Sequence, residues 1–534
     1  MPTIQLSRNG ITWTITGNNV GTNGQYINGD WWVVGPCTVN SVSPVTTGSG
    51  SSLRNGSMLN IRGDVRDLGH DGRGTGFLQS TVVVYPVNLV TNDTLVSCIS
   101  VVALPNPPTP YFGISTAGGS FVNNIAILTI VASAPAFPSF RPSYCSNPSS
   151  RLTVPYSNVN ISKLLTLPVL STISGDPTMQ PRLLATWSGG WSDHGQGDLR
   201  SSDHHPSIQM ETYGRDMSRC INDTVMWLSS NFSNATKTPI LLPFLQYGID
   251  LWGMWLDKRS WWIAQGHNHS RLLPIVFMGN ILGIGAALNP WSYKVESIQQ
   301  IQEIDDTYFS NSTGWHGGKS LRYGFSVNNF EEVPIGNWTS AEASDSSYMW
   351  CCTWDEYSAV SLLLRILGLA AGINHSELFS CGERWLVPLD TNMYNAWNAV
   401  VGANPGTVGG LGTPVLDEAW TIYHQTTHHI PNFSRVIGKV ASTNATLVMG
   451  APIPTLGGSY TFEIYRCPIT SGRLLVGDKL ESPIINGNSK LWVNPAVALV
   501  DQAFTANSYK IAVVPVILPS FYGHAKIIFQ AYWP

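Results

Sequence analysis

The strongest constraint in this sequence is a change of hydrophobic period that occurs twice along the chain. Residues 11–15 alternate apolar and polar side chains, which is the two-residue period of a half-buried strand. Over about 211–402, apolar residues recur every three or four positions, as in 240–256, which is the period of a helix. Alternation returns over 441–534. The order of periods predicts a multidomain α+β protein with a helical centre between β-rich ends.

The chain is also too long for one hydrophobic core, because 534 residues exceed the size at which single cores stop growing. The composition shifts predict an N-terminal β-sandwich, a Pro/Gly/Ser-rich connection, a central α/α-hairpin domain forming a partial toroid, a linker and a C-terminal β-sandwich of the fibronectin type. The corresponding ranges are 1–135, 136–210, 211–402, 403–440 and 441–534.

Individual elements follow from the same patterns. N-terminal strands are expected at 11–15, 31–34, 81–85, 94–102 and 125–131. Helices are expected at 211–229, 240–256, 271–288, 356–371 and 376–386. C-terminal strands are expected at 447–450, 460–465, 510–516 and 525–532.

Charge is scarce and balanced, which narrows the range of partners. Charged residues make up 12% of the chain and the net charge is −4, with no run of basic residues. Nucleic acid and anionic lipid both require clustered Lys and Arg, so neither is the expected partner. Residues 1–10 lack the apolar core of a signal peptide. The most apolar stretch, 272–288, contains Asn280 and three glycines, so we expect a buried helix rather than a membrane span.

The cysteines and glycosylation sequons bear on the compartment. The eight cysteines include no C-x-x-C pair, so buried thiols are expected rather than a zinc site. The many Asn-x-Ser/Thr sequons and the low charge favour an extracellular or virion-surface protein, with possible self-assembly into a larger particle. The sequons begin at Asn55, Asn92, Asn160, Asn222, Asn231, Asn234, Asn268, Asn311, Asn337, Asn374, Asn432 and Asn444.

Tryptophans concentrate in the central region. Indole faces stack on the apolar faces of sugar rings, so a group of them suits a polysaccharide or surface glycan. The alternative is that these rings fill the core. The densest group consists of Trp252, Trp255, Trp261 and Trp262.

Two polar motifs lie beside that group. Residues 246–250 read Gln-Tyr-Gly-Ile-Asp and residues 266–271 read Gly-His-Asn-His-Ser-Arg. We expect the first motif at the end of one helix and the second at the start of the next. Both motifs would then face the mouth of one cleft.

These motifs, with 301–309, 351–353, 28–36 and 55–58, resemble a set found in uncharacterised bacterial and phage multidomain proteins. That set reads Gln-Tyr-Gly-Ile-Asp, Gly-His-Gly-x-Gly-Arg, Glu-Asp-x-Gln-Thr-Tyr and Cys-Cys-Thr. A toroidal core beside β modules is similar to alginate-lyase-like polysaccharide lyases, which is an analogy of architecture.

The sequence departs from this set at several positions. Asn268 and Ser270 replace two glycines of the second motif, and Asp306 stands where an uncharged residue is expected. A drifted active site or a binding-only descendant is therefore an alternative to an enzyme.

If the chain is a lyase, the expected reaction is β-elimination on a uronate polymer. That reaction needs a base, a group that neutralises the carboxylate, and an acid for the leaving oxygen. Tyr247, His267 and Arg271 supply these types and are the expected catalytic residues. In the structural alternative, Tyr247 and Asp250 pack helices and Arg271 pairs with Asp250. The expected substrate-binding residues are Asn268, His269, Asp250, Trp252, Trp255, Trp261 and Trp262.

Three further possibilities stay open. A glycoside hydrolase needs two carboxylates across a cleft, and Asp250, Glu303, Asp305, Asp306, Asp355 and Glu356 are the candidates. No cofactor is expected, although Asp193, His194, Asp203, His204 and His205, or His424, His428 and His429, could bind a divalent metal. A non-catalytic structural or adhesive glycoprotein that binds glycans or assembles into polymers is the main rival to the lyase.

Overall fold

The computed structural model divides into two units, Met1–Glu418 and Ala419–Pro534. Up to residue 447 the structure describes the chain except 63–67, 75, 103–108, 113–119, 146, 149–150, 152, 194–204, 212, 260, 262–268, 294–300, 306, 314–318, 323–331, 335–336, 340, 343–353, 376, 380, 383–410 and 428–444. Beyond residue 447 it describes the strands alone. The chain is a mixed α+β protein, as the periodicities predict.

The first unit begins with two sheets. One has the strand order β1–β2–β5–β7 and the other β3–β4–β9–β8–β6. All neighbours are antiparallel except β4 and β9. The strands are β1 (Thr3–Arg8), β2 (Ile11–Thr16), β3 (Asn23–Gln25), β4 (Trp31–Val34), β5 (Cys37–Ser43), β6 (Ser57–Leu59), β7 (Val87–Leu89), β8 (Thr94–Ser100) and β9 (Val122–Val131).

Both sheets contribute to one hydrophobic core. In β2, Ile11, Trp13 and Ile15 are fully buried while the residues between them are half-exposed. They pack in one cluster with Leu95 of β8 and Leu128 of β9. The alternation read from the sequence therefore marks the buried face. The expected strand at 81–85 does not form, because only an isolated bridge between Met58 and Val82 is made there.

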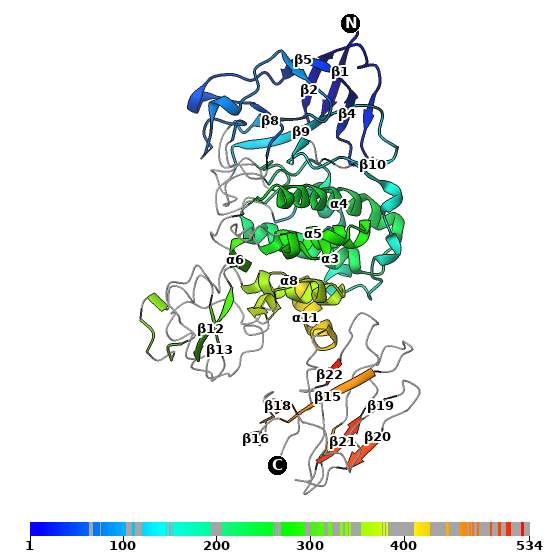
Figure 1. Cartoon of the computed structure of the whole chain (residues 1–534), viewed down its shortest axis with the longest axis vertical. Helices are drawn as coiled ribbons and strands as arrows, with labels where there is room; N and C mark the ends of the chain where they lie inside the picture. Colours follow the sequence, from blue (N-terminus) through cyan, green and yellow to red (C-terminus); the bar gives the residue numbers. More distant parts are fainter. Residues whose placement is uncertain are drawn as a thin grey trace. The chain divides into compact units, whose positions relative to one another are not determined.

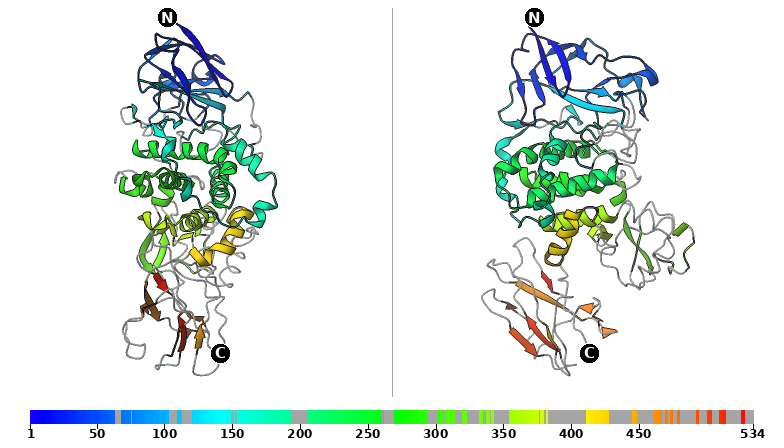
Figure 2. Two further views of the ribbon diagram at one scale, coloured as in Figure 1. Left: turned by 90° about the vertical axis from the view of Figure 1, so that its right-hand side faces the viewer. Right: turned by 180° about the vertical axis from the view of Figure 1, so that it is seen from behind.

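Helices follow the sheets, with α4 nearest to them (Figures 1 and 2). The α-helices are α1 (Ser171–Ser174), α2 (Met179–Trp187), α3 (Gly214–Ser229), α4 (Asn234–Leu256), α5 (Leu272–Leu282), α6 (Gln302–Asp305), α8 (Trp354–Ile366) and α11 (Pro414–Thr427). The 3-10 turns used below are η6 (His269–Arg271), η7 (Gly285–Leu288), η8 (Pro290–Tyr293) and η10 (Ala370–Gly372). Short strands are β10 (Ser139–Phe140), β11 (Val154–Pro155), β12 (Tyr308–Thr313) and β13 (Lys319–Arg322).

The expected helices at 211–229, 240–256, 271–288 and 356–371 are confirmed, with shifted ends. α4 begins six residues before Ile240, because the Ser233 side chain accepts a hydrogen bond from the Thr236 backbone N–H and so caps the helix. The expected helix at 376–386 lies largely outside the described residues.

α5 is buried at almost every position, as expected for 272–288. It packs against α4. Within the part of the chain that the structure describes, no helix combines the length and apolarity needed to cross a bilayer. Among the described residues, Cys37, Cys98, Cys145 and Cys220 are buried thiols outside any disulfide, as predicted, and Cys381 is also buried.

Three predicted ranges contain elements of another kind. The connecting range 136–210 includes α2, and the linker range 403–440 includes α11. The helical range 211–402 includes the antiparallel pair β12–β13. Apolar side chains of α2 and α11, among them Leu183 and Leu416, are buried. Both helices adjoin stretches rich in glycine and proline, which hid their periodicity in the sequence.

The second unit contains strands. They fall close to those predicted at 447–450, 460–465, 510–516 and 525–532. The strands are β14 (Ala445–Leu447), β15 (Tyr460–Arg466), β16 (Ile469–Thr470), β17 (Arg473–Leu474), β18 (Asp478–Lys479), β19 (Trp492–Val493), β20 (Val500–Ala503), β21 (Tyr509–Val513) and β22 (Ala525–Ile527).

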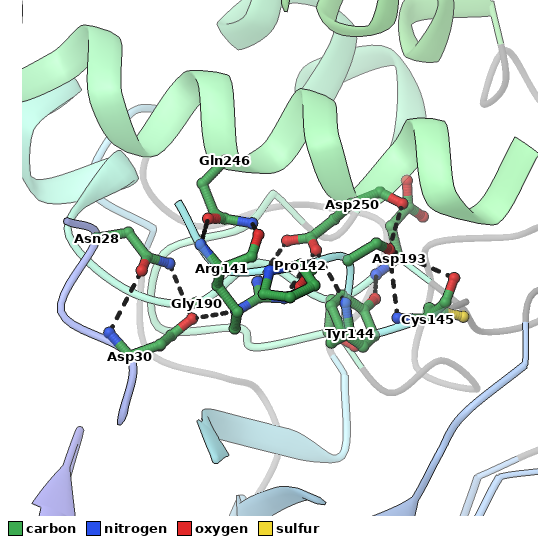
Figure 3. A network of polar contacts seen from close by, with 12 residues as sticks. Asn28, Asp30, Arg141, Pro142, Tyr144, Cys145, Gly190, Asp193, Gln246 and Asp250 are labelled. Atoms are coloured by element: carbon green, nitrogen blue, oxygen red, sulfur yellow. Dashed lines mark hydrogen bonds and ion pairs between the residues drawn. The ribbon is translucent and has the colours of Figure 1, made fainter. Parts of the chain in front are cut away.

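Arg141, directly after β10, connects the sheets to the helices. Its Nε donates to Asp30 Oδ2 at 2.6 Å, and its Nη1 and Nη2 donate to Asp250 Oδ1 and Oδ2 at 2.9 and 2.6 Å (Figure 3). Asp30 lies next to β4 and Asp250 lies on α4. Gln246, one turn earlier on α4, bonds both the N–H and the C=O of Arg141. One side chain therefore joins two layers of the unit.

All three charged side chains of this connection are buried. Burial opposes the charge of Arg141, but Asp250 and Asp30 raise its pKa above the ordinary value, so the guanidinium stays protonated. Burial raises the pKa of Asp250 to about 6, while Arg141 opposes the shift. Removing Arg141 would leave two buried carboxylates without their cation, which is costly.

We predict that Arg141→Ala destabilises the first unit by about 3–5 kcal/mol. Chemical denaturation followed by tryptophan fluorescence measures this change. The control is Arg322→Ala, which breaks the more exposed pair with Glu332 (side chains 32% and 21% exposed) and should cost about 0–1 kcal/mol. Equal effects of the two substitutions would contradict a special role for Arg141.

Candidate functional site

Two of the predicted catalytic side chains meet at one carboxylate. Arg271 donates from Nε and Nη2 to Asp193 Oδ2 and Oδ1, both at 2.6 Å. The Tyr247 hydroxyl donates to Asp193 Oδ2 at 3.1 Å. Arg271, Tyr247 and Asp193 are 1%, 2% and 4% exposed. We call these three residues, with Tyr144 and His205, the Asp193 cluster.

Separate elements position the cluster. Tyr247 lies in the middle of α4, and Arg271 closes η6 at the start of α5. The backbone N–H of Asp193 donates to the Tyr144 hydroxyl at 2.9 Å, and the Trp261 indole donates to the Asp193 carbonyl at 3.3 Å. The carboxylate is therefore held at its backbone as well as at its side chain.

An aromatic wall covers one side of the cluster. Trp187 and Trp191 stack with ring centroids 4.0 Å apart, and Trp191 lies 4.8 Å from the Tyr247 ring. The Arg271 guanidinium lies over Trp261 at 5.7 Å. These buried rings exclude water from the cluster, which strengthens the charge interactions between its residues.

Burial and the neighbouring Asp193 charge raise the pKa of Tyr247 well above its ordinary value. Burial also raises the pKa of Tyr144 well above the ordinary range. Both phenols therefore keep their protons at neutral pH. In this state Tyr247 is a hydrogen-bond donor and a possible general acid.

His205 brings a neutral imidazole to the cluster. It is 1% exposed, and neither ring nitrogen has a hydrogen-bond partner among the described residues. Burial, with the nearby positive charge of Arg271, lowers the pKa of His205 to about 3. A buried polar group without a partner is rare and often marks a ligand or water position.

Asp250 does not belong to this cluster. The structural alternative, in which Arg271 pairs with Asp250, is incorrect: Arg271 pairs with Asp193 and Asp250 with Arg141. Both Tyr247 and Asp250 lie inside α4 rather than at its end, because the helix continues to Leu256. Tyr247 and Asp250 lie three residues apart on one helix. Tyr247 bonds Asp193, the partner of Arg271, whereas Asp250 bonds Arg141.

The predicted sugar-binding tryptophans are mostly core residues. Trp255 and Trp261 are 1% and 0% exposed, and Trp252 is 8% exposed. The Trp255 indole donates to the Pro290 carbonyl at 3.0 Å. These rings present no open face to solvent. His267, Asn268 and Trp262 lie outside the described residues, as does the side chain of His269.

The structure describes some of the residues that the sequence suggested as metal ligands. Over the residues that the structure describes, no group of three or more His, Cys, Asp or Glu side chains is arranged to hold a metal. Asp193 and His205, first considered as metal ligands, belong instead to the polar cluster. His194, Asp203, His204, His428 and His429 lie outside the described residues.

A second buried acidic group lies around α3. Burial raises the pKa of Glu211 and of Asp223 to about 7. Asp223 accepts hydrogen bonds from Tyr111 and Thr413, both at 2.5 Å, and so connects α3 to the start of α11. Neither carboxylate stood out in the sequence. Since their folded pKa values are raised, they stabilise the fold below about pH 4.5 and this contribution is lost as the pH rises through 7.

Sequence reasoning did not assign Asp193, Tyr144 and His205 to the site of Tyr247 and Arg271. Asp193 follows the motif Trp187-Ser-Gly-Gly-Trp191, in a stretch rich in aromatic and polar residues. This density of aromatic and polar residues was the signal in the sequence that could have pointed to Asp193. The pairing itself depends on contacts between residues 78 positions apart in the chain.

Comparison with known proteins adds no family: no family model, curated protein or solved structure matches this chain. The resemblance to bacterial and phage proteins therefore remains a hypothesis from the motifs.

We predict that His205 makes the fold sensitive to acid. Below about pH 6.5 the unfolded chain binds a proton at this residue that the folded chain excludes until about pH 3. The His205 contribution to the unfolding free energy should therefore fall by about 2 kcal/mol between pH 7 and 5. His205→Asn should remove this part of the fall in unfolding free energy, as measured by urea denaturation at each pH.

The same slope in wild type and His205→Asn would refute a buried neutral imidazole at residue 205.

Proposed function

We propose that this chain is a carbohydrate-active protein of the extracellular space or a virion surface. Its chemical centre in this proposal is the Asp193 cluster, acting like a polysaccharide lyase on uronate polymers. The observation that carries the proposal is that Tyr247 and Arg271 meet at Asp193, while the buried, neutral His205 lies near enough to Arg271 to feel its charge. These groups supply an acid, a cation and a proton acceptor within one enclosed site.

The proposed reaction is a β-elimination. Arg271 exchanges Asp193 for the uronate carboxylate and stabilises the negative charge that develops there. A ring nitrogen of His205 takes the proton next to that carboxylate. The electron pair forms a carbon–carbon double bond, the glycosidic carbon–oxygen bond breaks, and the Tyr247 hydroxyl protonates the leaving oxygen.

His205 is a weak base in the unliganded site, because Arg271 and burial disfavour its cation. A bound uronate brings a negative charge beside Arg271. That charge raises the pKa of His205 towards its ordinary value. Substrate binding therefore activates the base in this scheme.

The surface supports the proposed location. Most sequon asparagines that the structure describes are exposed, whereas Asn222 is buried in α3 and Asn55 is half-buried and hydrogen-bonded to the Ser100 N–H. The exposed ones are Asn92, Asn160, Asn231, Asn234, Asn311, Asn337 and Asn374. Exposed sequons can accept glycans in a secreted protein.

A non-catalytic glycan-binding or assembly protein is the second candidate. Two observations favour it. Asp193 already binds Arg271 at both oxygens, and the Trp255 and Trp261 rings are sealed from solvent. In this case the Asp193 cluster is a buried ion pair that fixes the helices.

We predict that uronate polymers yield unsaturated products, detected by ultraviolet absorbance. Tyr247→Phe and His205→Asn should each reduce the rate by about 10²–10⁴, the usual contribution of a general acid or base. His267→Ala tests the base that the motif implies: turnover should persist if His205 is the base and be lost if His267 is the base.

The matched control is Tyr357→Phe, which removes another buried hydroxyl, one within hydrogen-bonding distance of Thr307 (3.2 Å) and outside the cluster. It should keep wild-type turnover. Circular dichroism checks that each variant is folded. Absence of turnover on every uronate polymer tested, or an unchanged rate in Tyr247→Phe, would favour the second candidate.

A further inference from the structure

A second aromatic group lies where the C-terminal end of α4 meets η8. The Trp255 indole bonds the Pro290 carbonyl, and the Trp291 ring packs edge-on against Trp255 at 5.7 Å. Tyr293 packs edge-on against Trp252 at 5.9 Å. Two buried rings of α4 thus support two rings of η8. We call Trp291 and Tyr293 the η8 platform.

The platform reaches solvent, unlike the rings beneath it. Tyr293 is 51% exposed and Trp291 is partly exposed. Leu256, at the end of α4, is 52% exposed. Rings that are fixed from below and open above lose little entropy when a ligand stacks on them. Aromatic rings held at a surface in this way can stack on the apolar face of a ligand.

Polar groups form a border on the Trp291 side of the platform. Asp305 Oδ1 accepts the Trp291 indole N–H at 2.9 Å, and the His375 ring lies parallel to Trp291 at 5.7 Å. Glu377 lies 3.8 Å from His375 Nδ1. The buried Oδ1 of Asn289, just before η8, has no hydrogen-bond partner within the described ranges. Aromatic faces next to carboxylates, an imidazole and an amide suit a ligand with an apolar face and many hydroxyls.

We propose that the η8 platform binds an uncharged saccharide, with a pyranose ring stacked on Tyr293 and hydroxyls bonded to the polar border. The local charge selects against uronates, because Asp305 and Glu377 contribute two carboxylates. Lys258 after α4 is exposed, and the acidic residue Asp257 precedes it in the chain. A polymer of uronates would meet like charge here, whereas neutral sugar hydroxyls can donate to these carboxylates.

This inference rests on the proposed carbohydrate role but does not need turnover at the Asp193 cluster. It places a neutral-sugar site against Trp252 and Trp255 of α4, the helix that also carries Tyr247 of the Asp193 cluster. Two such sites suit a glycan that contains both neutral sugars and uronates, in which the neutral sugars anchor the polysaccharide to the protein.

The test measures binding of neutral gluco- and manno-oligosaccharides and of oligogalacturonate to the full chain by calorimetry and tryptophan fluorescence. A neutral oligosaccharide should bind, and more tightly than oligogalacturonate. Tyr293→Ala should weaken neutral binding roughly tenfold, since it removes the stacking ring. Tyr293→Phe keeps the ring and should stay within about twofold.

Tyr247→Phe is measured in parallel. Its affinity for neutral oligosaccharides should equal that of wild type, whether or not its turnover of uronate polymers changes. This separates the platform from the Asp193 cluster. Tyr293 is exposed, so its substitution should leave the fold intact, as circular dichroism can verify. The proposal is overturned if no neutral oligosaccharide binds, if Tyr293→Ala binds as wild type, or if oligogalacturonate binds more tightly through the same ring.

Discussion

A buried guanidinium between two carboxylates organises the first unit. Arg141 binds Asp30 beside the sheets and Asp250 on α4, and Gln246 holds its backbone. Charges in a low-dielectric interior are costly unless they are paired with good geometry. The layers must therefore meet in the one arrangement that satisfies all three groups. A small lateral shift of α4 would break several charged hydrogen bonds at once.

The same connection reaches the Asp193 cluster. The Tyr144 backbone N–H donates to Asp250 Oδ1 at 3.1 Å, and the Tyr144 hydroxyl accepts from the Asp193 N–H (Figure 3). Tyr247 lies three residues from Asp250 on α4 and reaches Asp193 directly. Through Tyr247, the Asp193 cluster thus contacts the same helix that carries Asp250, the partner of Arg141. The proposed chemistry depends on this support, because proton transfer requires fixed distances.

Several elements could be read from the sequence. The alternation of Ile11, Trp13 and Ile15 marked a buried strand face, and α3, α4 and α8 were found from their three-to-four-residue spacing. The motifs also drew attention to Tyr247 and Arg271. Their common partner could not be found in this way, because Asp193 lies in a stretch without periodicity. Trp255 was expected at a sugar-binding face and lies in the core, since a large ring serves either role and only packing decides.

By itself, the sequence determined the order of β and α regions, the burial of the described cysteines and the main helices, because these depend on local period and on residue size and polarity. The tertiary structure decided the partners. It paired Arg271 with Asp193 rather than with Asp250, and it left Tyr293 exposed above the buried Trp252. The physical reason is that charge pairing and ring burial depend on which distant segments pack together. Spacing along the chain does not encode those contacts.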